Sequence, residues 1–150
     1  MRIGIISDTH GIFREQWKDI LLTCDSIFHL GDVNTQKCYE RFEKLGKPFY
    51  AVRGNCDYGE FAKYLPVVMK TPFKGKLFCL AHKKEDLPFD LTDCDFIICG
   101  HTHCYQNDEL FGKVYLNPGS AAMGRGNQET MMIMELEDDG YRVNKIVLHQ

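Results

Sequence analysis

The first eleven residues read Met1-Arg-Ile-Gly-Ile-Ile-Ser-Asp8-Thr-His10-Gly11, and they decide the fold class of the chain. The three isoleucines within positions 3–6 form a short apolar run, as in a central strand that is covered on both faces. Gly11 then lets the backbone leave the strand. Because open α/β sheets place ligand sites at the carboxyl ends of their strands, Asp8 and His10 are a candidate metal-binding or catalytic pair. The alternative is that Asp8 caps a following helix and His10 is an ordinary loop residue.

Length and composition indicate an ordinary globular domain. The chain has 150 residues, of which 44% are hydrophobic and 26% charged, so we expect one domain over residues 1–150 with a proper core. The net charge is -3 and no basic run occurs, which argues against a nucleic-acid-binding patch. No apolar stretch is long enough to cross a membrane, and no charged leader precedes the first strand, so we expect neither a membrane span nor a signal peptide.

The chain contains seven cysteines, and they are scattered without a Cys-x-x-Cys pair. A disulfide framework or a structural zinc site is therefore not expected. This usage is typical of the reducing cytoplasm, which is the predicted location.

The first half of the chain alternates strands and helices. Apolar spacing predicts helices over residues 13–22 and 35–45, and strands over residues 26–30 and 49–52. Each strand ends next to a glycine with an aspartate or asparagine beside it. Such alternation predicts a parallel sheet with right-handed crossovers.

The second half is typical of hairpins. Turn signals lie at Lys74-Gly75, at Gly112 and at Asp139-Gly140. The strands expected around them, with one further apolar strand, span residues 67–71, 77–81, 95–99, 130–137 and 141–148. We therefore expect an α/β fold in which two mixed sheets pack together with helices outside.

Polar residues at the ends of these strands form one set of possible metal ligands. They are Asp8, His10, Asp32, Asn55, His82, His101 and His103. Carboxylate and amide oxygens mixed with imidazole nitrogens suit Mn²⁺, Fe, Ni²⁺ or Zn²⁺ better than Ca²⁺ or a thiolate-bound metal. Seven ligands are too many for one such ion with an open position, and about right for two ions that share a ligand.

These stretches resemble the ordered motifs of the calcineurin-like metallophosphoesterases. The motifs are Asp8-x-His10, Gly31-Asp32, Gly54-Asn55-x-Asp57, His82 and Gly100-His101-x-His103. The short length and the Asn117-Pro-Gly-Ser120 stretch resemble the small single-domain phosphodiesterase branch of that family. The resemblance implies a four-layer α-β-β-α sandwich with a dinuclear metal site. It implies one ion held by Asp8, His10, Asp32 and His103, and another held by Asp32, Asn55, His82 and His101, with Asp32 bridging.

The same resemblance implies a metal-dependent hydrolase that attacks a phosphate ester with a metal-bridging hydroxide. Asp32, Asn55 and His10 are then the expected catalytic residues: a bridging ligand, an amide that assists at the phosphate and a weak proton donor. Mn²⁺ is the expected ion, with Ni²⁺, Fe or Zn²⁺ as alternatives, and the partner is a small phosphate-ester substrate. A homo-oligomer is left open.

Two departures from the family pattern bear on specificity. Where the family commonly has His-Gly-His, this chain has His82-Lys-Lys84, so Lys84 lies either near a substrate phosphate or in solvent. Cys56 stands where larger relatives have a histidine that protonates the leaving group, and a thiol is a poor substitute. We therefore expect a phosphodiesterase, with a phosphomonoesterase and a non-catalytic scaffold, such as the retromer branch of this fold, as alternatives.

Three further residues have two interpretations each. His29 is interpreted as a core residue or one that supports the ligands. Asp57 either orients a ligand or is a plain turn aspartate, and Arg53 is either a surface charge or a phosphate clamp.

Overall fold

The structure is a computed structural model that describes residues 1–148. Its first sheet has the strand order β10-β9-β1-β2-β3. The strands are β1 (Arg2–Ile6), β2 (Ser26–His29), β3 (Phe49–Ala51), β9 (Thr130–Glu137) and β10 (Gly140–Val147). The first three run parallel to one another, as predicted, while β9 and β10 are antiparallel additions at one edge.

The second sheet is also mixed, with the order β4-β5-β6-β8-β7. Its strands are β4 (Val68–Phe73), β5 (Lys76–Ala81), β6 (Phe96–Cys99), β7 (Tyr105–Leu110) and β8 (Lys113–Pro118). The hairpins predicted at Lys74-Gly75 and at Gly112 are confirmed as the antiparallel pairs β4–β5 and β7–β8, whereas β5, β6 and β8 run parallel.

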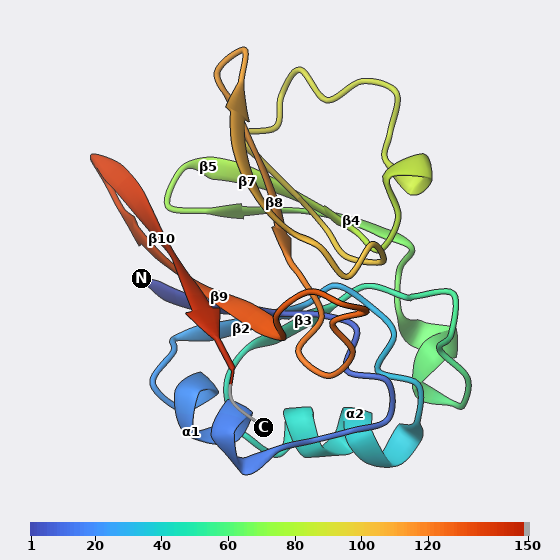
Figure 1. Ribbon diagram of the computed structural model, residues 1–150. Helices are drawn as coiled ribbons and strands as arrows, with labels where there is room; N and C mark the ends of the chain where they lie inside the picture. Colours follow the sequence, from blue (N-terminus) through green and yellow to red (C-terminus); the bar gives the residue numbers. More distant parts are fainter. Residues whose placement is uncertain (149–150) are drawn as a thin grey trace.

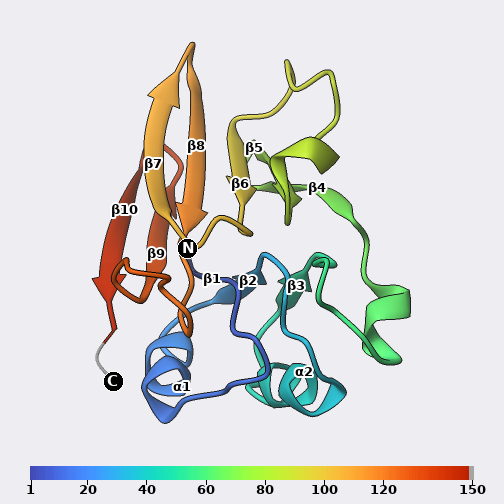
Figure 2. The ribbon, with the colours of Figure 1, turned by 45° about the vertical axis from the view of Figure 1, so that its right-hand side comes forward.

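Helices cover the first sheet on the side away from the second (Figures 1 and 2). They are α1 (Glu15–Leu21) and α2 (Gln36–Glu43), each slightly shorter than the apolar spacing predicted. Thr35 caps α2 by accepting the Cys38 amide on its hydroxyl. Over the second sheet the outer layer is thin, and the 3-10 helix η2 (Lys84–Asp86) with the loop to residue 95 covers it.

The core consists of two main layers that follow the alternation of side chains along each strand. Ile3, Ile5 and Phe28 point between the two sheets, where Phe78 and Ile98 of the second sheet meet them. The intervening positions of the first sheet point the other way, against Trp17, Leu21 and Phe42 of the helices. The four-layer sandwich is thereby confirmed, and register is fixed because a slip by one residue would exchange the two faces.

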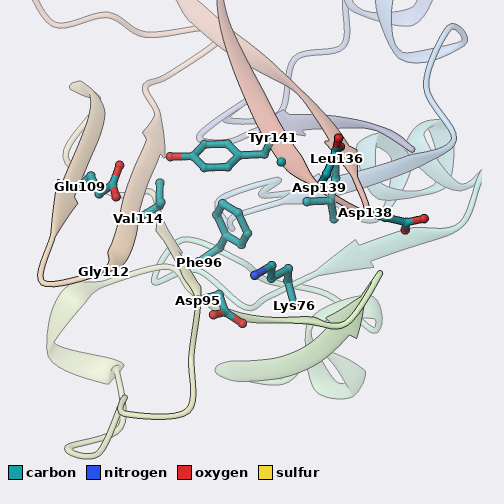
Figure 3. A pocket seen from close by; sticks show the side chains of 11 residues that line it. Lys76, Asp95, Phe96, Glu109, Gly112, Val114, Leu136, Asp138, Asp139 and Tyr141 are labelled. Atoms are coloured by element: carbon teal, nitrogen blue, oxygen red, sulfur yellow. The ribbon is translucent and has the colours of Figure 1, made fainter.

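At one end of the sandwich the two sheets separate around a cavity of about 240 Å³. Figure 3 shows Phe96 and Tyr141 along its wall, with their ring centroids 5.0 Å apart. The cavity lies at the amino end of β6, whereas the polar motifs follow the carboxyl ends of β1, β2, β3, β5 and β6.

The sequence did not predict the extent of one strand and missed one 3-10 helix. The Gly112 turn predicted a hairpin, but its first strand, β7, is polar along most of its length, so neither apolar alternation nor a continuous apolar run marks its bounds. The 3-10 helix η1 (Phe61–Tyr64) buries Phe61 and Ala62 against the core beside α2. Within the described residues, no helix has the length and apolarity needed to cross a membrane. The assignment of all 150 residues to one domain stays a prediction.

Candidate metal centre

Loops from both sheets meet where the parallel strands end. The amides of Asp8 and His10 donate to the carbonyls of Gly31 and Asp32, so the loops after β1 and β2 are joined. The His101 amide donates to the Asp8 carboxylate at 3.0 Å, which joins the second sheet to the first. All seven predicted ligand residues belong to these loops or to those after β3 and β5.

The first group of possible ligands consists of Asp8, His10 and His103, whose ligand atoms lie within 4.8 Å of one another. The Nε2 atoms of His10 and His103 are 3.2 Å apart. Asp8 Oδ1 lies 3.3 Å from His103 Nε2 and 3.8 Å from His10 Nε2. A carboxylate oxygen and two imidazole nitrogens thus face one point.

The second group consists of Asp32, His82 and His101. Asp32 Oδ2 lies 3.2 Å from His82 Nε2, which in turn lies 2.9 Å from the side-chain oxygen of Asn55. Asp32 Oδ2 is also 3.8 Å from His10 Nε2 of the first group. Asp32 is thus within 4 Å of histidines from both groups, as is Asp8, whose Oδ1 lies 3.9 Å from His82 Nε2.

Hydrogen bonds to backbone carbonyls fix the tautomers of two histidines. His82 Nδ1 donates to the Leu30 carbonyl at 2.6 Å, and His103 Nδ1 donates to the carbonyl of Met123. Nε2 is consequently the ring atom that each of these histidines turns toward the carboxylates. Metal-ligating histidines are held in the same way, with the second ring nitrogen donating to an oxygen.

A buried acceptor without a donor supports a cation at this point. Among the described residues, no hydrogen bond reaches Asp8 Oδ1, although Asp8 is fully buried. Its other oxygen accepts from the Ser7 hydroxyl and from the His101 amide. An unsatisfied buried carboxylate oxygen is costly, so the donor set and this oxygen together fit divalent metal ions.

The site keeps its carboxylates ionised. Burial opposes the charge on Asp32, but hydrogen bonds from His82 and the Cys56 amide outweigh it and lower the pKa of Asp32 to about 2. Burial also opposes the charge on Asp8, but the His103 ring, whose Nε2 lies 3.3 Å from Oδ1, and the charge of His82 outweigh it, so the pKa of Asp8 lies below its usual value.

The pKa values of His82 and His10, which both face these carboxylates, are shifted in opposite directions. Burial alone would lower the pKa of His82, but its hydrogen bond with Asp32 and the charge of Asp8 raise it. For His10 burial prevails over both carboxylates and lowers the pKa.

The backbone at the site is strained. Most non-glycine residues with positive φ lie in the loops after β1, β2 and β6. They are Asp8, His10, Asp32, Asn34, His101 and His103. L-residues avoid this region, and holding one there costs on the order of 1 kcal/mol or more. Short polar side chains tolerate it best, and here it turns successive side chains toward the same point.

Two glycines allow the close approach of the loops. A Cβ atom on Gly54 would lie 2.2 Å from Asp32 Oδ1, and one on Gly100 would lie 2.2 Å from Ser7 Oγ. Any larger residue at either position would displace a carboxylate or its hydrogen-bond donor.

Two of the open interpretations are settled by contacts. Asp57 is buried and accepts from three amides, those of Asp32, Asn34 and Gly54, so it holds the loops after β2 and β3 together. His29 is fully buried, and its ring joins Thr9 Oγ1 to the Gly31 amide. Both residues support the ligands through the backbone.

Sequence reasoning missed the supporting role of Ser120. Its hydroxyl donates to the Asp8 carbonyl at 2.7 Å and accepts from the amides of Ala122 and Met123. It therefore attaches the loop after β8 to the loop after β1. The signal was its place in the Asn117-Pro-Gly-Ser120 stretch, but a lone serine gives no indication of its partner.

Cys56 faces the site, whereas Lys84 does not. Cys56 Sγ lies within 4.8 Å of ligand atoms of His10 and Asp32, and burial and the Asp32 charge raise the pKa of its thiol. Lys84 is exposed and lines an apolar cavity of about 280 Å³ with Leu87 and Ile97, on the outer face of the second sheet.

Comparison with known proteins gives relatives over nearly the whole chain. The profile of the calcineurin-like phosphoesterase superfamily domain matches residues 1–139. The probable metallophosphoesterase YsnB of Bacillus subtilis is 29% identical to this chain. The alignment is 161 positions long with its gaps, and it covers 95% of this chain and 89% of that protein. A probable metallophosphoesterase of Methanocaldococcus jannaschii is 28% identical over 150 residues, covering 92% of this chain and 77% of its own length.

Solved structures agree with this. A novel archaeal phosphodiesterase superimposes with a TM-score of 0.82 at 26% identity, over 99% of this chain and 100% of the other. Zinc-bound Vps29 of Entamoeba histolytica gives a TM-score of 0.76 at 22% identity, over 98% and 99% of the two chains. At that identity the likeness to Vps29 concerns the fold alone.

Proposed function

The chain belongs to the calcineurin-like phosphoesterase superfamily, and on that premise we propose that it hydrolyses phosphodiester bonds at a site for two divalent metal ions. The observation that carries the proposal is the pair of ligand groups, Asp8 with His10 and His103, and Asp32 with His82 and His101. The carboxylates of Asp8 and Asp32 both lie within 4 Å of histidines from the two groups, and the family resemblance assigns the shared position to Asp32.

The seven predicted residues divide the work of holding the ions. Asp8, His10, Asp32 and His103 would hold one ion, and Asp32, Asn55, His82 and His101 the other. When bound, two such ions supply Lewis acidity, which activates a water molecule and stabilises charge on the phosphate oxygens. Mn²⁺ is the ion we propose, because oxygen and imidazole ligands in this proportion suit it.

The protein itself contributes orientation. Leu30 and Met123 fix the rings of His82 and His103 through their carbonyls. Asn55 presents its side-chain oxygen to His82, while its side-chain nitrogen donates to Cys56 Sγ at 3.3 Å. Such prearranged groups contribute to catalysis because they need no reorganisation during the reaction.

The preference for diesters follows from Cys56. The leaving group of an alkyl phosphomonoester is a strongly basic alkoxide, so its departure needs a proton donor. A histidine at this position could donate that proton, and a cysteine thiol is poorly suited to it. A diester with a good leaving group needs little proton donation and carries one negative charge fewer, so hydroxide attacks it more readily.

The proposal is tested by turnover of matched substrates. Purified protein is assayed with bis(p-nitrophenyl) phosphate and p-nitrophenyl phosphate after addition of Mn²⁺, Ni²⁺, Mg²⁺ or Zn²⁺. We expect activity that requires added metal and a higher kcat/KM for the diester. Absence of turnover with every ion, in protein that binds metal, would favour the non-catalytic scaffold. A preference for an alkyl phosphomonoester over the diester would refute the inference from Cys56.

A further inference from the structure

A third group of possible ligands includes a sulfur atom. A ring nitrogen of His10, a carboxylate oxygen of Asp32 and the Cys56 sulfur lie within 4.8 Å of one another. His10 also belongs to the first group described above, and Asp32 to the second. Among residues 1–148, no other group of this kind contains a cysteine. The Cys56 sulfur therefore lies at the proposed metal centre, in addition to the seven residues with oxygen and nitrogen ligands.

Hydrogen bonds define where this sulfur lies. The Cys56 amide donates to Asp32 Oδ1 at 2.8 Å. The Asn55 side chain donates through its nitrogen to Cys56 Sγ at 3.3 Å, and its oxygen lies 2.9 Å from His82 Nε2. Cys56 is thus attached through both its backbone and its side chain to residues of the proposed ligand set.

The other six cysteines do not combine access with such a position. Five of them are buried, namely Cys24, Cys38, Cys79, Cys94 and Cys99. Cys104 is exposed next to His103, but within the described residues it belongs to no group of possible ligands. Cys56 is partly exposed, so an ion that enters the site can reach its sulfur.

Resting on the proposed function, we propose that Cys56 is a ligand for thiophilic divalent ions such as Zn²⁺ and stays uncoordinated when the centre holds Mn²⁺. Sulfur ligands suit Zn²⁺, whereas Mn²⁺ prefers carboxylate, carbonyl and water oxygens. On binding, the S–H bond breaks, a sulfur–metal bond forms and the proton passes to solvent. His10 and Asp32 would bind the same ion.

The sulfur would change what the bound ion can do. Zinc sites with four protein ligands are closed, whereas catalytic zinc sites keep a position for water or substrate. A thiolate added to imidazole and carboxylate ligands occupies such a position. The protein should therefore turn over diesters with Mn²⁺ and bind Zn²⁺ in a slower form, so the identity of the ion would control activity.

Cobalt reports the metal–sulfur bond without turnover. Co²⁺ substitutes for Zn²⁺, and a thiolate bound to Co²⁺ gives a charge-transfer band in the near ultraviolet. Wild-type protein loaded with Co²⁺ should show this band, and Cys56→Ser should lose it. The matched control is Cys104→Ser, which removes the exposed thiol next to His103 and should keep the band. X-ray absorption of the Zn²⁺-loaded wild type should give a sulfur neighbour at about 2.3 Å from zinc.

Competition with a chromophoric chelator measures how the protein selects its ions. Cys56→Ser should bind one Zn²⁺ ion about 100-fold more weakly than the wild type, since removal of a direct ligand should cost at least as much as removal of a supporting group. Its affinity for Mn²⁺ should be nearly unchanged. Wild-type turnover of bis(p-nitrophenyl) phosphate should be slower with Zn²⁺ than with Mn²⁺, and this difference should shrink in Cys56→Ser.

Three results would refute the role of Cys56 while Mn²⁺-dependent turnover still supports the phosphoesterase. The first is a wild type that holds Co²⁺ and Zn²⁺ without the band or the sulfur neighbour. The second is a band that persists in Cys56→Ser or disappears in Cys104→Ser. The third is an equal loss of Zn²⁺ and Mn²⁺ affinity in Cys56→Ser, which would show that the residue supports the site without selecting the ion. If the wild type binds none of these ions, both proposals fail together.

Discussion

Replacing Asp57 should destabilise the protein more than the loss of an ordinary loop residue. The Asp57 side chain is 1% exposed. One of its oxygens accepts from the amides of Asp32 and Gly54 at 3.0 and 2.6 Å, and the other accepts from Asn34 at 2.8 Å. Asp57→Ala would leave three amides without this acceptor, two of them buried and one partly buried.

The size of the effect follows from these three bonds. At about 1.5 kcal/mol each, the low end for hydrogen bonds to a charged group, their loss gives about 4–5 kcal/mol. For a chain of this length that corresponds to a fall in Tm of roughly 10 °C or more. Asp57→Asn keeps one oxygen for two of the amides but turns an N–H₂ group toward the third, so we expect about 2 kcal/mol.

Urea unfolding of metal-free protein measures both variants, and repetition with Mn²⁺ shows whether a misplaced Asp32 also weakens metal binding. The control is Asp90→Ala, since Asp90 is an exposed aspartate that accepts only from Thr92 in its own turn. That variant should unfold close to the wild type. If Asp57→Ala lost less than about 1 kcal/mol of unfolding free energy, the proposed role of Asp57 would be wrong, because even a few unsatisfied amides should cost more than that.

Three further predictions concern the ligands and their support. Asp32→Ala should lose most of its bound metal and activity, whereas His29→Ala should lose roughly 10–100-fold in metal affinity or in activity. If Asp32→Ala kept its metal and His29→Ala lost it, the assignment of Asp32 as the shared ligand would be wrong. Cys56→His should gain activity on alkyl phosphomonoesters, measured as kcat/KM, and no gain would remove the argument for diesters. Burial holds the pKa of His29 at about 3, below the usual 6.5, so its contribution to stability is complete above pH 6.5 and is lost as the pH falls toward 3. His29→Asn, whose side-chain oxygen can still accept from Gly31, should therefore show a flatter loss of unfolding free energy between pH 7 and 5 in urea titrations, and an unchanged slope would contradict this.

The sequence predicted the architecture well where side-chain periodicity is strong. The isoleucines of β1 and the glycine turns of the hairpins identified buried strands and antiparallel pairs. The extent of the polar strand β7 was not predicted, because it pairs with β8 through the backbone and its side chains show no apolar alternation. The thin outer layer over the second sheet was also not predicted, because it consists of η2 and a loop whose mixed polar and apolar residues show no periodicity.

The candidate site was predictable in its ligands and not in their support. Aspartate and histidine at strand ends reveal possible ligands by chemistry alone. Asp57 and Ser120 act across gaps of many residues, through backbone amides and carbonyls. A partner of that kind cannot be read from residue type, because almost any nearby residue can supply a backbone group.

Anomalous scattering at the manganese edge, recorded from crystals grown with Mn²⁺, would locate the ions in the proposed dinuclear site. We expect two strong peaks about 3.5–4 Å apart, one between His10 and His103 and one between His82 and His101, with Asp32 in contact with both. A single peak, or a pair that does not include Asp32, would contradict the proposed site.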